Sequence, residues 1–262
     1  MACVNKEDRS HFAELLRALD ESDTWAARIG PGAERLRPAP RSPLWGDDDR
    51  AHPYELSHAA WHFLSHAVDH LSCLRALLRD AKVIHMYAPF SLVRAALENA
   101  CAAVWMLQPP RRADRLARRL RFAVTDIRNG EQVKQAIGQP GPRSEQERIK
   151  EVRAIAGRAG VDEAAVRRGA PYSEIIQAVG DSAGPAASAI YLSWKLCSGM
   201  AHGDFWPTWG AMQRVELPGA PKGTGTFKIE ADVKLLMYVT AFAVNLTRQG
   251  WQLYDQRCRP PS

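Results

Sequence analysis

Apolar residues recur at spacings of three and four along most of the chain, which is typical of amphipathic helices. Runs rich in proline and glycine separate these periodic segments. The pattern predicts long helices over residues 7–29, 54–79, 89–108, 110–137, 144–158, 184–201 and 231–254, with short helical pieces filling 161–180. Helices therefore dominate the predicted structure, and no alternation of strands with helices is present.

One stretch departs from the helical pattern. In residues 209–230, "AMQRVEL" and "TGTFKIEA" alternate apolar and polar positions on either side of "PGAPKGTG", which predicts a β-hairpin. The predicted fold class is therefore all-α, a multi-helix bundle with one small β-hairpin insertion near 209–230. Because residues 30–53 hold many of the prolines, we divide the chain into an N-terminal helix with a connector, 1–52, and a helical bundle domain, 53–262.

Composition narrows the class of protein more than it narrows the function. The chain has 262 residues, of which 46% are hydrophobic and 24% charged, as in globular proteins with a sizeable core. The net charge of +6 permits binding to nucleic acid or another polyanion. Five scattered cysteines and an N-terminus without an apolar segment predict a cytoplasmic protein with reduced thiols and no membrane partner. No phosphate-binding loop is present, and we expect no cofactor.

Four of the eight histidines lie in "ELSHAAWHFLSHAVDH", each four residues after the last. Such a row winds around a helix by about 40° per step. We therefore expect His58 and His62 to face solvent and His66 and His70 to lie at the core edge. His70 is a candidate binding residue, and a metal held by His66 and His70 is an alternative that needs ligands from another helix. The core-facing stripe of this helix is predicted to be Ala60, Leu64, Ala67, Leu71, Leu74 and Leu78.

Two other helices each carry a narrow polar line among apolar residues. In the nearly all-apolar segment 92–107, Arg94 and Glu98 are four residues apart and can pair directly. Buried polar groups need partners, so such charges are a functional hint. The second line, at the end of the segment 184–201, consists of Tyr191, Lys195, Ser198 and His202.

We hypothesise that these two lines face each other and form one site. Its walls would be Trp105 and Trp206, with Asp204 beside them. Arginine and lysine would bind an anion, and His202 would act as general acid or base. The alternative is that Arg94 and Glu98 form a structural pair and that His202 only caps helix carbonyls.

The segment "PPRRADRLARRLRF" predicts an amphipathic helix with an arginine face. One interpretation is that Arg118 and Arg119 contact the phosphates of RNA or DNA. The other is a solvated face, or ion pairs with the nearby Asp114, Asp126 and Glu131.

Three stretches, "SLVRAALENACAAVWML", "PPRRADRLARRLR" and "YLSWKLCSGMAHG", together resemble a family of uncharacterised bacterial α-helical proteins. That family has an Arg–Glu helix and a Ser-x-x-x-His-Gly helix end, and its overall shape is similar to the HEPN class. The resemblance covers roughly residues 50–255. Many HEPN domains are RNases or toxin components that use an arginine shortly before a histidine, often at a dimer interface. The resemblance thus implies a homodimer and a catalytic His202, but Lys195 stands where the arginine is expected.

Three functions stay open at this point. The first is a HEPN-like protein that acts on or binds RNA or nucleotides, with a stress or defence role. The second is a pocket for an anionic small molecule, enzymatic or not, built on Arg94, Glu98, Tyr191 and His202. The third is a non-catalytic interaction protein, and the sequence does not decide whether the chain is an enzyme.

Overall fold

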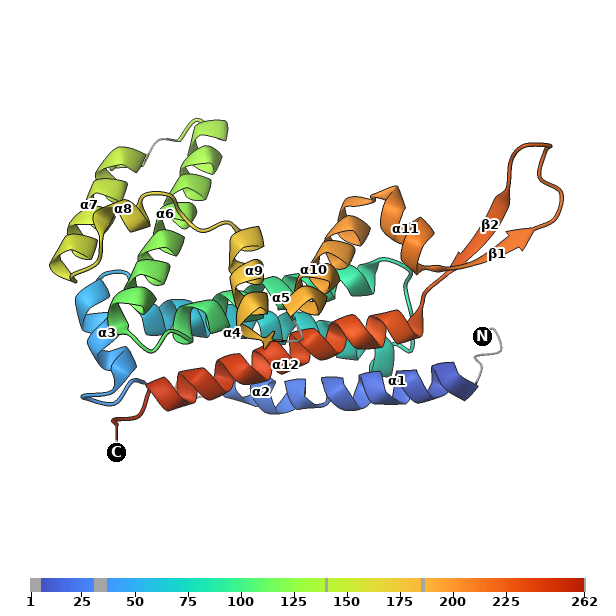
Figure 1. The fold of residues 1–262 in the computed structure, drawn as a ribbon, viewed down its shortest axis with the longest axis horizontal. Coiled ribbons are helices and arrows are strands. Elements are labelled where there is room, and N and C mark those ends of the chain that lie inside the picture. The colour runs from blue at the N-terminus through green and yellow to red at the C-terminus, as the bar shows by residue number, and fades with distance from the viewer. Residues whose placement is uncertain (1–5, 31–36, 140, 185–186, 262) are drawn as a thin grey trace.

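The computed structural model describes residues 6–30, 37–139, 141–184 and 187–261, and it confirms an all-α bundle with one small hairpin. Figure 1 shows a layer of helices that run side by side along the length of the molecule, and further helices that stand on one face of this layer. The layer consists of α1 (Lys6–Leu19), α2 (Glu21–Ile29), α4 (Leu56–Arg75), α5 (Ala88–Leu107) and α12 (Val233–Arg257). A π-helical turn, Ala76–Asp80, continues α4.

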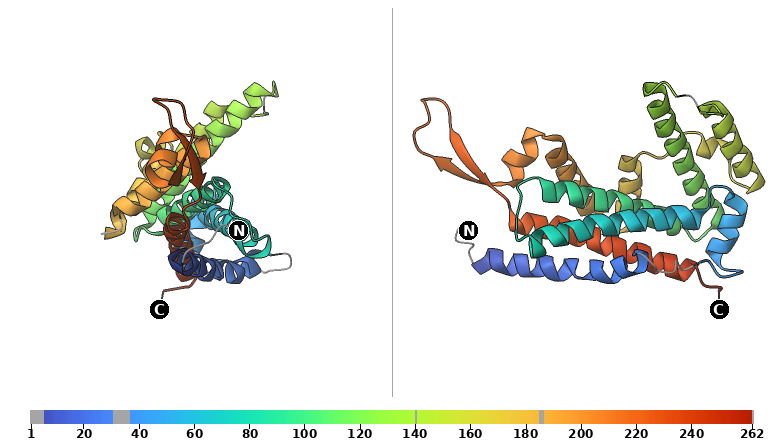
Figure 2. Two further views of the ribbon diagram at one scale, coloured as in Figure 1. Left: turned by 90° about the vertical axis from the view of Figure 1, so that its right-hand side faces the viewer. Right: turned by 180° about the vertical axis from the view of Figure 1, so that it is seen from behind.

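The helices on that face form two groups. One group, at the end where the C-terminus lies, contains α3 (Pro43–Ala51), α6 (Arg112–Ala136), α7 (Glu145–Arg158) and α8 (Glu163–Val166). The other contains α9 (Tyr172–Ser182), α10 (Ala187–His202) and α11 (Phe205–Ala211). The right-hand view in Figure 2 shows the same division from behind.

The core is built around α5, which packs against α4, α12, α10 and α9. Each residue from Ala100 to Leu107 is buried. The stripe predicted for α4 is confirmed, because Ala60, Leu64, Leu78 and its other members are between 0% and 1% exposed. A second cluster of apolar residues lies between α6, α7 and α8 and includes Leu120 and Val152.

The apolar character of α5 has a structural explanation. In the described part of the chain it is the one helix long and apolar enough to cross a membrane, with a hydropathy of 1.3. However, 67% of its apolar stretch is buried inside the bundle. A helix that is apolar on all sides is expected where neighbours surround it.

The N-terminal region differs from the prediction in two ways. The segment expected as one helix is divided into α1 and α2 at Asp20, and both pack into the main core through Leu15, Leu19 and Trp25. Part of the expected connector forms α3, in which the Ser42 hydroxyl accepts a hydrogen bond from the backbone N–H of Trp45 at 3.2 Å. Serine as N-cap before proline is a helix start signal, which the proline-rich composition of the segment obscured.

The predicted hairpin is present as β1 (Gln213–Leu217) and β2 (Thr226–Glu230). The strands pair antiparallel, with Val215 opposite Lys228. The hairpin joins α11 to α12 and projects beyond the helices (Figure 1). On one of its faces the ring of Phe227 lies 5.4 Å from that of Trp209 in α11.

Candidate functional site

The Arg94–Glu98 pair and α10 do lie against each other, but through a residue that sequence reasoning missed. Arg94 Nε lies 3.0 Å from Glu98 Oε1, and Trp194 Nε1 donates a hydrogen bond to the same oxygen at 2.8 Å. The rings of Trp194 and Tyr191 are 5.8 Å apart. Trp194 lies three residues after Tyr191 and four before Ser198, so the helical spacing could have placed it on this line.

His202 lies at a different place, at the C-terminal end of α10. It borders a cavity of about 600 Å³ together with Asp204, Tyr87, Trp209 and Ile229, among others. Apart from His202, neither Arg94 and Glu98 nor Tyr191, Lys195 and Ser198 border this cavity. The physical reason is length, because the eleven residue steps from Tyr191 to His202 extend about 16 Å along a helix axis. This corrects the single site inferred from the helical wheel.

The two tryptophans predicted as walls also lie apart. Trp105 is 2% exposed and belongs to the core. The guanidinium groups of Arg118 and Arg121 lie over its ring, at 5.2 and 5.7 Å from the centroid. Trp206 is 52% exposed on α11. The two side chains therefore do not enclose a common pocket.

The arginines of α6 mainly connect helices. Arg115 Nε lies 2.7 Å from Asp47 Oδ2 in α3, and Arg121 Nη2 lies 2.6 Å from Glu174 in α9. Arg111 and Arg112 also pair with carboxylates. The arginine face is thus largely a set of ion pairs, as one of the two interpretations expected, although most of the partners lie outside α6.

Among the arginines of α6, Arg118 and Arg119 differ, since neither forms a salt bridge with a carboxylate in the described chain. Arg118 donates to the Trp105 carbonyl at 2.6 Å, and Arg119 donates from Nε to the Glu55 carbonyl at 3.2 Å. Burial lowers the pKa of both guanidinium groups. Each nevertheless stays charged at neutral pH.

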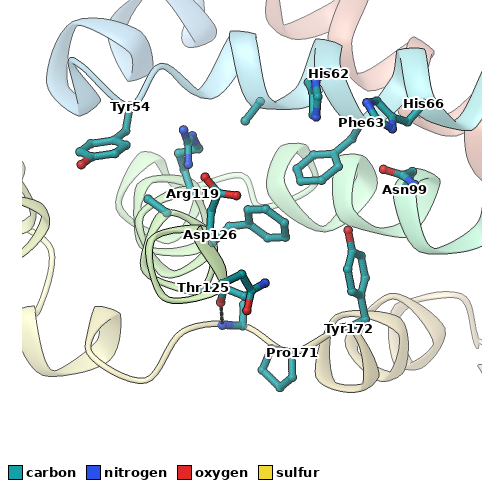
Figure 3. Close-up of a pocket in the computed structure, with 15 residues that line it drawn as sticks. Tyr54, His62, Phe63, His66, Asn99, Arg119, Thr125, Asp126, Pro171 and Tyr172 are labelled. Carbon is teal, nitrogen blue, oxygen red and sulfur yellow. Dashed lines mark hydrogen bonds between the residues drawn. The ribbon is translucent and has the colours of Figure 1, made fainter. Parts of the chain in front are cut away.

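Arg119 borders a cavity of about 760 Å³ between α4, α5, α6 and the start of α9 (Figure 3). Side chains from all four helices and from the segment before α9 point into it. Its lining consists of Tyr54, Ala59, His62, Phe63, His66, Asn99, Arg119, Phe122, Ala123, Thr125, Asp126, Asn129, Ala170, Pro171 and Tyr172.

Two histidines of the α4 row form the upper wall of this cavity in Figure 3. The ring centroids of His62 and His66 are 4.2 Å apart. His62 was expected to face solvent; it does lie opposite the core stripe, but α6 and the start of α9 border the space in front of it. His58 is exposed and lies 3.8 Å from Glu55, and His70 is half-buried outside this cavity. The predicted exposure is confirmed for His58 and His62, and His70 is half-buried as expected, whereas His66 is exposed rather than at the core edge.

The wall opposite the histidines adds hydrogen-bonding groups. Burial, together with Glu98 and Asp126, raises the pKa of Tyr172 to about 12, so its hydroxyl stays a donor at neutral pH. Asn99 donates from Nδ2 to the Ala95 carbonyl at 2.8 Å, which leaves its side-chain oxygen as an acceptor. Figure 3 shows the Asp126 carboxylate near the Arg119 side chain.

The segment before α9 is fixed by a side chain of α6. The Thr125 hydroxyl accepts a hydrogen bond from the Ala170 N–H at 2.8 Å. Gly169 has a φ of +78°, and a Cβ there would lie 2.8 Å from the same hydroxyl oxygen. Glycine is therefore required for this close approach, which places Pro171 and Tyr172 at the cavity.

An aromatic floor completes the cavity. The rings of Phe63 and Phe122 meet edge to face at 4.7 Å, and the ring of Tyr172 lies 6.3 Å from that of Phe122. An apolar aromatic surface with a few convergent polar groups is the usual composition of a small-molecule site. In the described residues no group of three or more His, Cys, Asp or Glu side chains could hold a metal ion, which gives the His66–His70 metal alternative no support.

Comparison with protein-family models gave no match, and comparisons with curated proteins and with solved structures gave no significant match. The HEPN resemblance is therefore still a prediction from sequence.

Proposed function

We propose that this protein binds a small molecule that carries one anionic group and one flat ring, in the cavity bordered by His62, His66, Arg119 and Tyr172. The anionic group would lie against the Arg119 guanidinium and the two imidazoles. The ring would pack on Phe63 and the other aromatic side chains of the floor. Carboxylates and phosphates are the groups that arginine binds best.

The observation that carries the proposal is the state of the Arg119 guanidinium. Only its Nε donates a hydrogen bond within the described chain, to the Glu55 carbonyl. Both terminal nitrogens lack a protein acceptor there, whereas Arg115, Arg118 and Arg121 each donate from a terminal nitrogen to a carboxylate or carbonyl. The charges of Asp126 and Glu55 partly offset that of Arg119. Because Arg119 borders the cavity and no carboxylate binds its terminal nitrogens, these N–H groups can donate to an anionic ligand there.

The histidines predict how binding depends on pH. Burial lowers the pKa of His62, the neighbouring His66 lowers it further, and Asp126 opposes both. The ring is therefore neutral at pH 7. An anion beside it would favour the protonated form and raise its pKa in the complex. By linkage, affinity should increase as the pH falls below 7. The same two rings and Asp126 could exchange protons with a ligand, which would make the site enzymatic.

The proposal is tested by calorimetric titration of the full chain with inorganic phosphate, a nucleoside monophosphate and benzoate. We expect at least one of these probes to bind, and the Arg119→Gln variant to bind it about ten- to a hundred-fold more weakly, because a charge-assisted contact is lost. Benzoate stays ionised between pH 5.5 and 8, so it also reports the expected increase in affinity with falling pH.

Arg118→Gln is the matched control, since Arg118 neighbours Arg119 on α6 and contacts Trp105 rather than the cavity. It should leave affinity unchanged. Equal losses in both variants would mean that the positive charge of α6, and not the cavity, attracts the ligand. Absence of binding by all three probes would reject the proposed ligand class.

We also propose a second function, action on RNA at His202, as the HEPN resemblance implies. The supporting observation is the surroundings of His202, where Phe205, Trp206 and Trp209 are exposed beside the cavity that His202 borders. Exposed aromatic rings are the platforms on which single-stranded bases stack. A cytoplasmic location and a role in stress or defence belong to the same proposal.

This second function predicts RNA cleavage that does not require a metal. Total RNA incubated with the protein in EDTA should be cleaved, and the His202→Gln variant should lose the activity, since a general acid or base contributes about 10²- to 10⁴-fold. His58→Gln is the control, because His58 is an exposed histidine at the other end of the bundle. Cleavage that survives His202→Gln, or no cleavage at all, would refute this function.

A further inference from the structure

The hairpin presents an unpaired strand edge. All five residues of β1 are exposed, and the two-stranded sheet extends away from the helices (Figures 1 and 2). A two-stranded hairpin is only marginally stable in water, and an open edge has backbone groups ready to pair with another strand. From the charge pattern of this edge, we propose that β1 pairs antiparallel with β1 of a second copy of the chain.

The charges of β1 are complementary to themselves. In an antiparallel pair centred on Val215, Arg214 of each copy lies opposite Glu216 of the other. Two opposite-charge pairs therefore form across the new edge, and directly opposed charges of opposite sign stabilise a sheet. The exposed Val215 side chains, 52% accessible in one copy, contact each other at the centre. Such an interface is isologous, as in most homodimers.

Neighbouring registers and the other edge are less favourable. A pair centred on Arg214 or on Glu216 places like charges opposite each other, which destabilises the sheet. A β2 pair centred on its middle residue would oppose two copies of Lys228. A β2 pair centred on Ile229 would also place Lys228 opposite Glu230, but these two side chains already pair with each other within β2, and Ile229 and Glu230 are half-buried. The Val215-centred β1 pair is favoured because its charges are complementary and all five of its strand residues are exposed.

The positions of the helices allow this arrangement. β1 begins at α11 and runs outward, so antiparallel pairing puts the two helical bodies at opposite ends of a four-stranded sheet. Arg214, Glu216 and Phe227 share the face of the hairpin on which Trp209 packs, and the Arg214 guanidinium lies 5.0 Å from the Trp209 ring. A five-residue edge buries little area, so we expect a weak, concentration-dependent dimer.

A charge exchange tests the proposal by analytical ultracentrifugation of the full chain. The Arg214→Glu and Glu216→Arg variants should each dimerise roughly ten-fold more weakly, because both cross-strand pairs become repulsive. The double variant should regain dimerisation. An equimolar mixture of the two single variants should form a heterodimer, because the altered strands complement each other.

Lys150→Glu on α7 is the control for net charge, since Lys150 is exposed far from the hairpin. Thermal unfolding of each variant monitors the fold. A wild-type chain that is monomeric at all concentrations would overturn the proposal. So would a dimer that the single variants leave intact, or a double variant and a mixture that both fail to associate.

Discussion

Replacing Asp47 by asparagine should destabilise the protein by about 3–5 kcal/mol, the cost of leaving a buried charge without its partner. Asp47 in α3 is 0% exposed and Arg115 in α6 is 2% exposed. Arg115 binds both carboxylate oxygens, at 2.7 and 2.9 Å, and donates from Nη1 to the carbonyls of Pro109 and Pro110. The amide of asparagine offers one acceptor and no charge. Urea denaturation of both proteins measures the difference.

Asp114→Asn, in the first turn of α6, is the matched control. Its partner Arg111 has a side chain that is 79% exposed, and an ion pair in water contributes about 1 kcal/mol or less. The two substitutions are chemically identical, so their difference isolates burial. If Asp47→Asn is as mild as Asp114→Asn, the Asp47–Arg115 pair does not hold α3 against α6.

The Trp105→Ala substitution should also cost about 3–5 kcal/mol, the usual range for truncating a buried large aromatic side chain. Its ring lies under the guanidinium groups of Arg118 and Arg121, so two cation–π contacts disappear with it. The sequence suggested instead that Trp105 walls a pocket, in which case ligand binding would weaken while stability changed little.

Trp206→Ala gives the comparison, because both tryptophans were predicted for the same role. Trp206 is half-exposed, and its truncation should cost about 1 kcal/mol or less. Thermal and urea unfolding of the two variants would distinguish them. Similar losses of stability in the two variants would contradict the finding that Trp105 is buried while Trp206 is half-exposed.

Local patterns were sufficient for most of the helices. The stripe of α4 is buried as predicted, and the alternation near 209–230 does form β1 and β2. Both depend on the period of the side chains, which is a property of the backbone. The exceptions were the division of the first helix at Asp20, the short helix α11, which no predicted helix covers, and α3. For α3, the Ser42–Pro43 start signal was present but was outweighed by the surrounding prolines.

The candidate site could be predicted only in part. Sequence indicated that Arg119 and the histidine row were unusual, and both reach the larger cavity. It offered a nucleic-acid surface for Arg119, and it placed His62 in solvent without indicating that the exposed ring borders a cavity. Asp126 was considered only as an ion-pair partner, and Tyr172, in one of the short helical pieces, gave no signal.

The sequence by itself determined the helices, their apolar stripes, the hairpin and the Arg94–Glu98 pair, since each depends on residues a few positions apart. Only the tertiary structure decided which polar residues meet. It brought Arg119, His62 and Tyr172 together around one cavity and separated His202 from Arg94. The reason is that a helical wheel gives direction around an axis, whereas a site also requires the same height along it and a neighbouring helix to enclose the space.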